Sequence, residues 1–284
     1  MICERRVQRA PIAYEPCCYA GSKLTFRGPA RRLTGDYIAF PGGTETYGRF
    51  LREPFAAQLE RRLGISCVNL GWPNAGADAF LNDAGALRIA TGARAVVLQV
   101  MGAHNLSNRF YRVHPRRNDR VLEPLSPLRR LFPEVDFVDF NFTRHLLRHL
   151  HAVSPERFDL VREELRMTWV ERTGALIARL ERPVILLWFA QRPPEGFCER
   201  VEPGTDPVFV TAGMLRAVAP QAARLIEVSA SPVAQRMGTS GMVFAPEEAQ
   251  AARQLPGALA HGEAAQALAP ALRAVLDLRE TGVA

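Results

Sequence analysis

Short apolar runs that alternate with helical patterns constrain the fold of this chain more than any other feature. The clearest run, Ala95–Met101, is almost continuously apolar and ends at a glycine. Four further runs are interpreted as strands: Tyr37–Phe40, Ser66–Leu70, Pro183–Phe189 and Leu225–Val228. Continuous apolar strands separated by helices are typical of a parallel sheet that is covered on both faces. The pattern predicts a three-layer α/β/α sandwich with a central parallel sheet of about five strands.

The segments between these runs carry helical periodicity. In Pro54–Leu63, for example, Phe55, Leu59 and Leu63 recur on one helix face. Further helices are expected at Ala77–Ala90, Phe142–Val153, Pro155–Leu180, Thr211–Ala223 and Glu263–Leu278. We therefore predict a single α/β domain over residues 36–278 with a helical insertion at about 103–180. Residues 1–35 are predicted to form an N-terminal extension packed on that domain.

A full hydrophobic core is available to this chain, because 48% of its 284 residues are hydrophobic and 23% are charged. The net charge of +7 comes from 36 basic residues, of which only Lys23 is a lysine. A basic balance favours anionic partners such as phosphate, sulfate or carboxylate groups. The competing interpretation is a solvated arginine-rich surface without a specific partner.

Cysteine usage and the N-terminus indicate a cytoplasmic protein. The five cysteines show no C-x-x-C spacing, which favours free thiols in a reducing compartment. No apolar segment follows the charged residues at the N-terminus, so we expect no secretory signal. No run of about 20 apolar residues occurs, so we expect no membrane span. The oligomeric state stays open.

Residues able to carry chemistry follow the ends of several predicted strands. Thr44 stands after the first strand and Asn105 after the third, while His261 stands in the predicted loop before the last helix. Because the carboxyl ends of parallel strands meet at one edge of the sheet, we expect these side chains to converge. Thr44 would be the nucleophile, His261 its base, and Asn105 a donor to a developing oxyanion.

Other residues of the same loops are candidate oxyanion or substrate ligands: Gly43, Asn74, Gly76 and His104. The amides of Thr44 and Gly76 would help Asn105 to hold the oxyanion. A structural interpretation competes for each position. Thr44 would then cap a helix, and the asparagines would be turn residues that tolerate unusual backbone angles.

Taken in order, these blocks resemble the SGNH/GDSL hydrolase superfamily, in particular a divergent bacterial SGNH-like family. The first block of the superfamily, Gly-Asp-Ser-x-Thr-x-Gly, aligns with Gly42–Gly48. Its Asn-x-Gly block aligns with Asn69–Gly71, its Gly-x-Asn block with Gly102–Asn105, and its C-terminal histidine with His261. The resemblance implies strands in flavodoxin-like order and an esterase or acyltransferase that uses no cofactor.

The chain departs from the superfamily pattern at three positions. Thr44 replaces the serine, Gly43 replaces the aspartate of the first block, and Ala258 replaces the aspartate that orients the histidine. A triad uses that carboxylate to fix the imidazole tautomer, so a backbone carbonyl, Glu247 or Glu248 would have to orient His261. The departures leave open a non-catalytic SGNH-like protein that binds an anionic ligand.

The long polar segment Gly102–Pro127, predicted to be a loop, carries five arginines between Asn108 and Arg120. Arginine binds phosphate, sulfate or carboxylate bidentately, so Arg109, Arg116 and Arg117 are candidate substrate ligands. We therefore expect an acylated, anionic small molecule or saccharide as the substrate. The alternative is that these arginines pair with surface acids. No nucleic-acid-binding motif accompanies them, and no nucleic acid is expected.

Two other types of site fit the sequence less well. His145 and His149 share a helix face, but no His-Glu-x-x-His motif is present, so no metal is expected. The segment Gly42–Thr46 resembles a degenerate phosphate loop, as in sulfotransferases, but it lacks the lysine and the spacing of that motif. Sulfotransferase-like nucleotide binding at Gly42–Thr46 is the third functional alternative.

Overall fold

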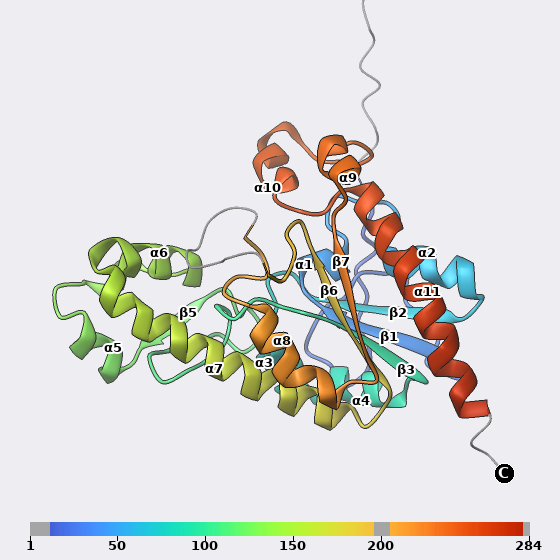
Figure 1. The fold of residues 1–284 in the computed structure, drawn as a ribbon, viewed down its shortest axis with the longest axis horizontal. Helices are drawn as coiled ribbons and strands as arrows, with labels where there is room; N and C mark the ends of the chain where they lie inside the picture. The colour runs from blue at the N-terminus through green and yellow to red at the C-terminus, as the bar shows by residue number, and fades with distance from the viewer. Residues whose placement is uncertain (1–11, 196–204, 281–284) are drawn as a thin grey trace, which may run out of the picture.

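A five-stranded parallel sheet forms the centre of the molecule, in the order β2-β1-β3-β6-β7 (Figure 1). The computed structural model describes residues 12–195 and 205–280. The sheet strands are β1 (Tyr37–Gly42), β2 (Ser66–Gly71), β3 (Ala95–Gln99), β6 (Val184–Ala190) and β7 (Arg224–Ser229). Over these five strands the order is flavodoxin-like, so the predicted fold class is confirmed.

The remaining elements of the described residues are, in chain order, α1 (Thr44–Tyr47), α2 (Phe55–Leu63), α3 (Ala77–Leu81), α4 (Ala84–Gly92), β4 (Tyr111–Val113), β5 (Val121–Pro124), α5 (Ser126–Leu131), η1 (Phe137–Asp139), α6 (Thr143–Val153), α7 (Pro155–Leu180), α8 (Ala212–Val218), η2 (Ala219–Gln221), α9 (Pro232–Met237), η3 (Pro246–Glu248), α10 (Ala249–Arg253) and α11 (Ala258–Glu280).

Helices cover both faces of the sheet, which gives the predicted three layers (Figure 1). On one face α2 and α11 pack against strand side chains such as Ile38 and Val97. On the other face α4, α7 and α8 pack against the strand residues adjacent to these in sequence, such as Ala39 and Val96. Successive strand residues point to opposite faces, and both faces are covered, which explains why the strands are continuously apolar.

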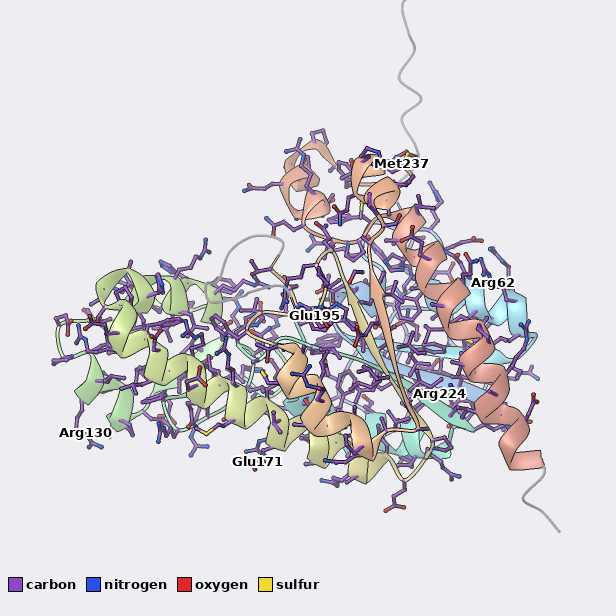
Figure 2. All side chains as sticks on the ribbon, in the orientation of Figure 1. Arg62, Arg130, Glu171, Glu195, Arg224 and Met237 are labelled. Carbon is purple, nitrogen blue, oxygen red and sulfur yellow. The ribbon has the colours of Figure 1, made fainter. Side chains whose placement is uncertain are left out.

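Charged side chains lie on the outside of this sandwich. Figure 2 shows Arg62, Arg130 and Glu171 projecting outward from the peripheral helices. None of the helices within residues 12–195 and 205–280 is both long and apolar enough to cross a membrane.

The segment between β3 and β6 extends to one side of the sheet as β4, β5, α5, α6 and the start of α7 (Figure 1). The prediction of a loop over Gly102–Pro127 is partly wrong, because β4 and β5 form an antiparallel hairpin there. Alternation explains the hairpin: Tyr111 and Val113 are buried while Arg112 between them is exposed. An isolated bridge between Arg120 and Phe142 ties the hairpin to α6.

Two helices differ from their predicted bounds. The helix predicted over Ala77–Ala90 is two helices, because the Asp83 carboxylate accepts from the Ala86 N–H and so begins α4 anew. The last helix begins at Ala258, five residues before the predicted Glu263. The residues Ala258–Gly262 include no proline, so the helix continues through them, and His261 lies inside α11 rather than in a loop.

The described part of the N-terminal segment is fixed to the sandwich at a turn. Leu24 and Phe26 are buried in the main core. The Arg27 guanidinium donates to the carbonyl oxygens of Gly48 and Leu51, among others, in the turn after α1. Because buried backbone acceptors need partners, this arginine stabilises the turn that follows the Gly-Gly-Thr loop.

Candidate active site

A cavity of about 150 Å³ opens at the carboxyl edge of the sheet. The loops after β1, β2 and β3 bring five predicted site residues to its wall: Gly43, Thr44, Asn74, His104 and Asn105. Side chains from outside the sheet complete the wall, and the charged ones are Arg49, Arg144 and Asp206. The cavity therefore contains a hydroxyl, an imidazole, amides and charges of both signs.

Thr44 is the first residue of α1, and its hydroxyl lies at the junction of two loops. The N-cap position belongs to Gly43, so Thr44 is not the cap. The Thr44 Oγ accepts a hydrogen bond from the Asn74 N–H at 3.0 Å. Asn74 presents this N–H from the left-handed region, with φ at 58°. Because the Thr44 oxygen is the acceptor, the hydroxyl proton remains available for donation.

Gln99, the last residue of β3, holds the Gly-Gly-Thr turn in place. Its Oε1 accepts from the Gly43 N–H at 2.8 Å, and from the N–H and hydroxyl of Thr46 at 3.2 and 2.6 Å. Its Nε2 donates to the Glu45 carboxylate at 2.7 Å. One buried amide therefore fixes both the turn and an acid. Since the Gly43 N–H is engaged, its predicted role as an oxyanion or substrate donor is not supported.

The Glu45 carboxyl lines the cavity next to Thr44. Burial and, to a smaller extent, the nearby Asp206 charge raise its pKa to about 7, although the bond from Gln99 and the charge of Arg144 act in the opposite direction. Asp206 is itself bound by Arg144, whose Nη2 lies 2.6 Å from both carboxylate oxygens. A carboxyl that titrates near neutral pH is suited to accept and return a proton.

His104 and Asn105 contribute neutral groups to the cavity. His104 is 3% exposed, and burial together with Arg144 lowers its pKa well below the usual range. Its Nδ1 has no hydrogen-bond partner among the described residues. The Asn105 Nδ2 donates to the Asn74 carbonyl at 2.9 Å, and its Oδ1 accepts from the Thr143 hydroxyl at 2.7 Å. The loops after β2 and β3 are thus joined by Asn105.

His261 does not line the cavity, which corrects the predicted pairing with Thr44. It is 1% exposed in α11, and its ring packs on Phe55 and Phe189 at centroid distances of 5.7 and 4.8 Å. Its Nδ1 accepts from the Phe55 N–H at 3.1 Å, so a backbone amide orients the imidazole. Burial and the charge of Arg27 lower its pKa to about 3. The ring is therefore a neutral core side chain.

Neither glutamate proposed to orient His261 does so. Glu248 is bound by Arg49 at 3.0 Å and by the Ala245 N–H at 3.2 Å. Glu247 is exposed. The carboxylate that a triad requires is therefore not supplied by these two residues.

Gly76 also has a structural role instead of the predicted catalytic one. Its N–H donates to the Asn118 side chain at 2.8 Å and is not available to an oxyanion. A Cβ at this position would lie 2.2 Å from the Asn105 carbonyl oxygen. Only glycine allows the loops after β2 and β3 to approach so closely.

The three arginines predicted to bind substrate do not line the cavity. Arg109 pairs with Glu164 at 3.0 Å, and the Arg116 side chain is exposed. Arg117 lines a separate cleft beside the cavity. His145 and His149 also lie away from the cavity. Both are in α6, and both pack on the ring of Phe140, which precedes that helix.

The cavity residues that were missed from the sequence include Glu45, Gln99, Arg144 and Asp206. Gln99 had a signal, as a single amide within an almost continuously apolar strand. Glu45 lies inside the motif that located the site. Arg144 and Asp206 carried no signal, because they stand about 100 and 160 positions from the motif and only the tertiary fold brings them to it.

Comparison with known proteins places the chain in context. A family model described as a domain of unknown function (DUF6473) matches residues 1–276. No curated protein matches. Similar solved structures include a lipase from a goat rumen metagenome, with a TM-score of 0.45 and 13% identity over 85% of this chain and 97% of that chain.

A lipase/acylhydrolase from Enterococcus faecalis has a TM-score of 0.45 and 13% identity over 84% of this chain and 96% of that chain. An acetylxylan esterase from Geobacillus stearothermophilus has a TM-score of 0.43 and 13% identity over 85% of this chain and 94% of that chain.

Proposed function

The chain belongs to the family described as a domain of unknown function (DUF6473), and we propose that it is an esterase or acyltransferase with an altered SGNH-type site. One observation carries the proposal. The Thr44 hydroxyl and the Glu45 carboxyl line the same cavity, and Gln99 and Asn74 hold them there. A positioned hydroxyl beside a carboxyl that titrates near neutral pH is a nucleophile with a proton acceptor.

In the proposed reaction the Thr44 oxygen attacks the ester carbonyl, and the leaving alcohol departs with the proton that Thr44 loses. The ionised Glu45 accepts that proton through a water molecule and returns it to the leaving alcohol. The acyl group then passes from Thr44 to water, in a hydrolase, or to a second alcohol, in an acyltransferase. Thr44 and His104 both line this cavity, and the Thr44 N–H and the His104 ring would contact the carbonyl or the alcohol.

The test is hydrolysis of p-nitrophenyl acetate and of acetylated sugars by the purified chain. Thr44→Ala and Glu45→Gln are expected to lower kcat by about 10²–10⁴, the usual contribution of a positioned proton-transfer group. His261→Ala is expected to keep kcat per folded molecule while it lowers Tm, because it removes a core ring. Wild-type turnover in Thr44→Ala, or loss of turnover in a folded His261→Ala, would contradict the proposal.

A second candidate is a non-catalytic protein that binds an anionic ligand. The observation that favours it is the burial of His261 in the core, which leaves Thr44 without the imidazole base that the sequence predicted. Binding of acetylated or anionic sugars without turnover, measured by calorimetry, would support this candidate. Nucleotide binding at Gly42–Thr46 has less support, because the Gly43 and Thr46 amides that a phosphate needs already donate to Gln99.

A further inference from the structure

A second hollow, which we call the Trp72 cleft, adjoins the cavity. It has a volume of about 420 Å³, and its main lining residues are Phe26, Tyr47, Trp72, Asn74, Arg117 and Arg120. Asn74 lines both spaces. Since the Asn74 N–H also binds the Thr44 hydroxyl, a ligand that contacts Asn74 in the cleft is separated from the proposed nucleophile only by Asn74.

One wall of the Trp72 cleft is aromatic and fixed. Trp72 and Tyr47 are half-buried, and Phe26 is fully buried behind them. The Trp72 indole N–H donates to the Arg116 carbonyl, so the ring is held in one orientation. A fixed aromatic surface with one polar edge suits the apolar face of a ring-shaped ligand.

Three charged residues also line the cleft. The Arg117 guanidinium is exposed and has no ion-pair partner among the described residues. Arg120 stacks over Phe142 at 3.9 Å from the ring centroid. One carboxylate, Asp119, also lines the cleft, and it accepts from the Asn74 side chain at 3.2 Å. Two guanidinium groups against one carboxylate leave a single positive charge, which matches a monoanion.

We infer that the Trp72 cleft binds a sugar ring that bears a carboxylate, so that the substrate is an ester of an acidic saccharide. The aromatic wall would contact the face of the ring, and Arg117 with Arg120 would bind the carboxylate. The inference deepens the proposed function and rests on it for the ester, while the binding of the sugar is a separate property of the cleft.

Binding is tested by NMR titration with methyl β-D-glucuronide and methyl β-D-glucoside, which differ only at the carboxylate. The glucuronide is expected to bind wild-type protein about tenfold more tightly, and Arg117→Gln is expected to remove that preference. Arg112→Gln is the matched control, because Arg112 is an exposed arginine of the same segment that pairs with Glu123 outside the cleft. Equal binding of both sugars, or a preference that survives in Arg117→Gln, would overturn the inference.

Two further arms separate the explanations. Tighter binding of glucose 6-phosphate than of the glucuronide would overturn the carboxylate assignment in favour of a phosphate. Acetyl esters of the two glycosides then test the link to catalysis by their kcat/KM ratio. Binding that depends on Arg117 without any ester turnover would refute the proposed function but not the inference about the cleft. Turnover of both esters at equal kcat/KM would refute the inference that the cleft selects an acidic saccharide.

Discussion

At the scale of single residues, Glu45 is a cavity group whose protonation the fold changes strongly. Its carboxyl has an ordinary pKa of 4.5, and burial beside Asp206 raises that pKa to about 7. In the folded protein the carboxyl therefore keeps its proton over a range of pH in which the unfolded chain has lost it. Folding stability that depends on this group is complete below pH 4.5 and is lost as the pH rises through about 7.

This loss of stability with rising pH can be measured. We expect the Tm of the wild type to fall relative to that of Glu45→Gln as the pH is raised from about 5 to about 8, because only the wild type must release the proton. Scanning calorimetry at several pH values measures the difference. Glu171→Gln, at an exposed site on α7, is the control and should follow the wild type (Figure 2). A constant difference between wild type and Glu45→Gln would contradict a raised pKa.

At the scale of elements, the site depends on how closely the loops after β1, β2 and β3 approach. Gln99 at the end of β3 binds the turn after β1, and Asn105 binds the loop after β2. Glycine permits the contact at Gly76, where a Cβ would lie 2.2 Å from the Asn105 carbonyl oxygen. The position of Asn74, and through it the Thr44 hydroxyl, therefore depends on a residue without a side chain.

Gly76→Ala is expected to lower the free energy of unfolding by about 1–3 kcal/mol, because the added methyl meets backbone that cannot move away freely. Any ester hydrolysis should fall with it, since the Asn74 N–H would shift away from Thr44. Gly213→Ala is the control, because the nearest atoms to its Cβ would be 3.7 Å away. Urea denaturation measures the stability of both variants. A Gly76→Ala midpoint equal to that of the wild type would show that the loops are not in close contact.

At the scale of the whole molecule, the cavity is assembled from distant parts of the chain. Arg144 comes from α6, on the insertion between β3 and β6, and Asp206 comes from the segment before α8. Their ion pair joins these two segments above the carboxyl edge of the sheet. Both residues therefore influence the pKa of Glu45, which belongs to the loop after β1, although burial is the largest cause of its shift.

Asp206→Asn tests this coupling. Removal of the Asp206 charge eliminates a cause of the raised Glu45 pKa, and it frees Arg144 to stabilise the Glu45 carboxylate. Both effects act in one direction, so the pKa of Glu45 is expected to fall from about 7 toward 4.5. A carbon-13 NMR titration of the Glu45 carboxyl measures it without reference to activity. Asp139→Asn, at an exposed site in η1, should leave the titration unchanged.

Much of the architecture was predictable from the sequence because it depends on local pattern. Continuous apolar runs mark strands that are buried on both faces, and i, i+4 spacing marks the helices that cover them. The same pattern located the loops that carry Thr44, Asn74 and Asn105. Gly42-Gly43-Thr44 was informative for the same reason, since glycines after a buried strand indicate a tight turn at the sheet edge.

Only the tertiary structure decided which groups share the cavity. The sequence placed His261 in a loop, but the helix begins at Ala258 and turns the imidazole into the core beside Phe55 and Phe189. It gave no reason to join Glu45 to Gln99, Arg144 and Asp206, because hydrogen bonds and charge interactions between distant segments depend on chain folding, not on local spacing. The sequence by itself determined the sheet and the edge at which the site lies, whereas the chemistry of that site depends on contacts that form only when the insertion and the sheet come together.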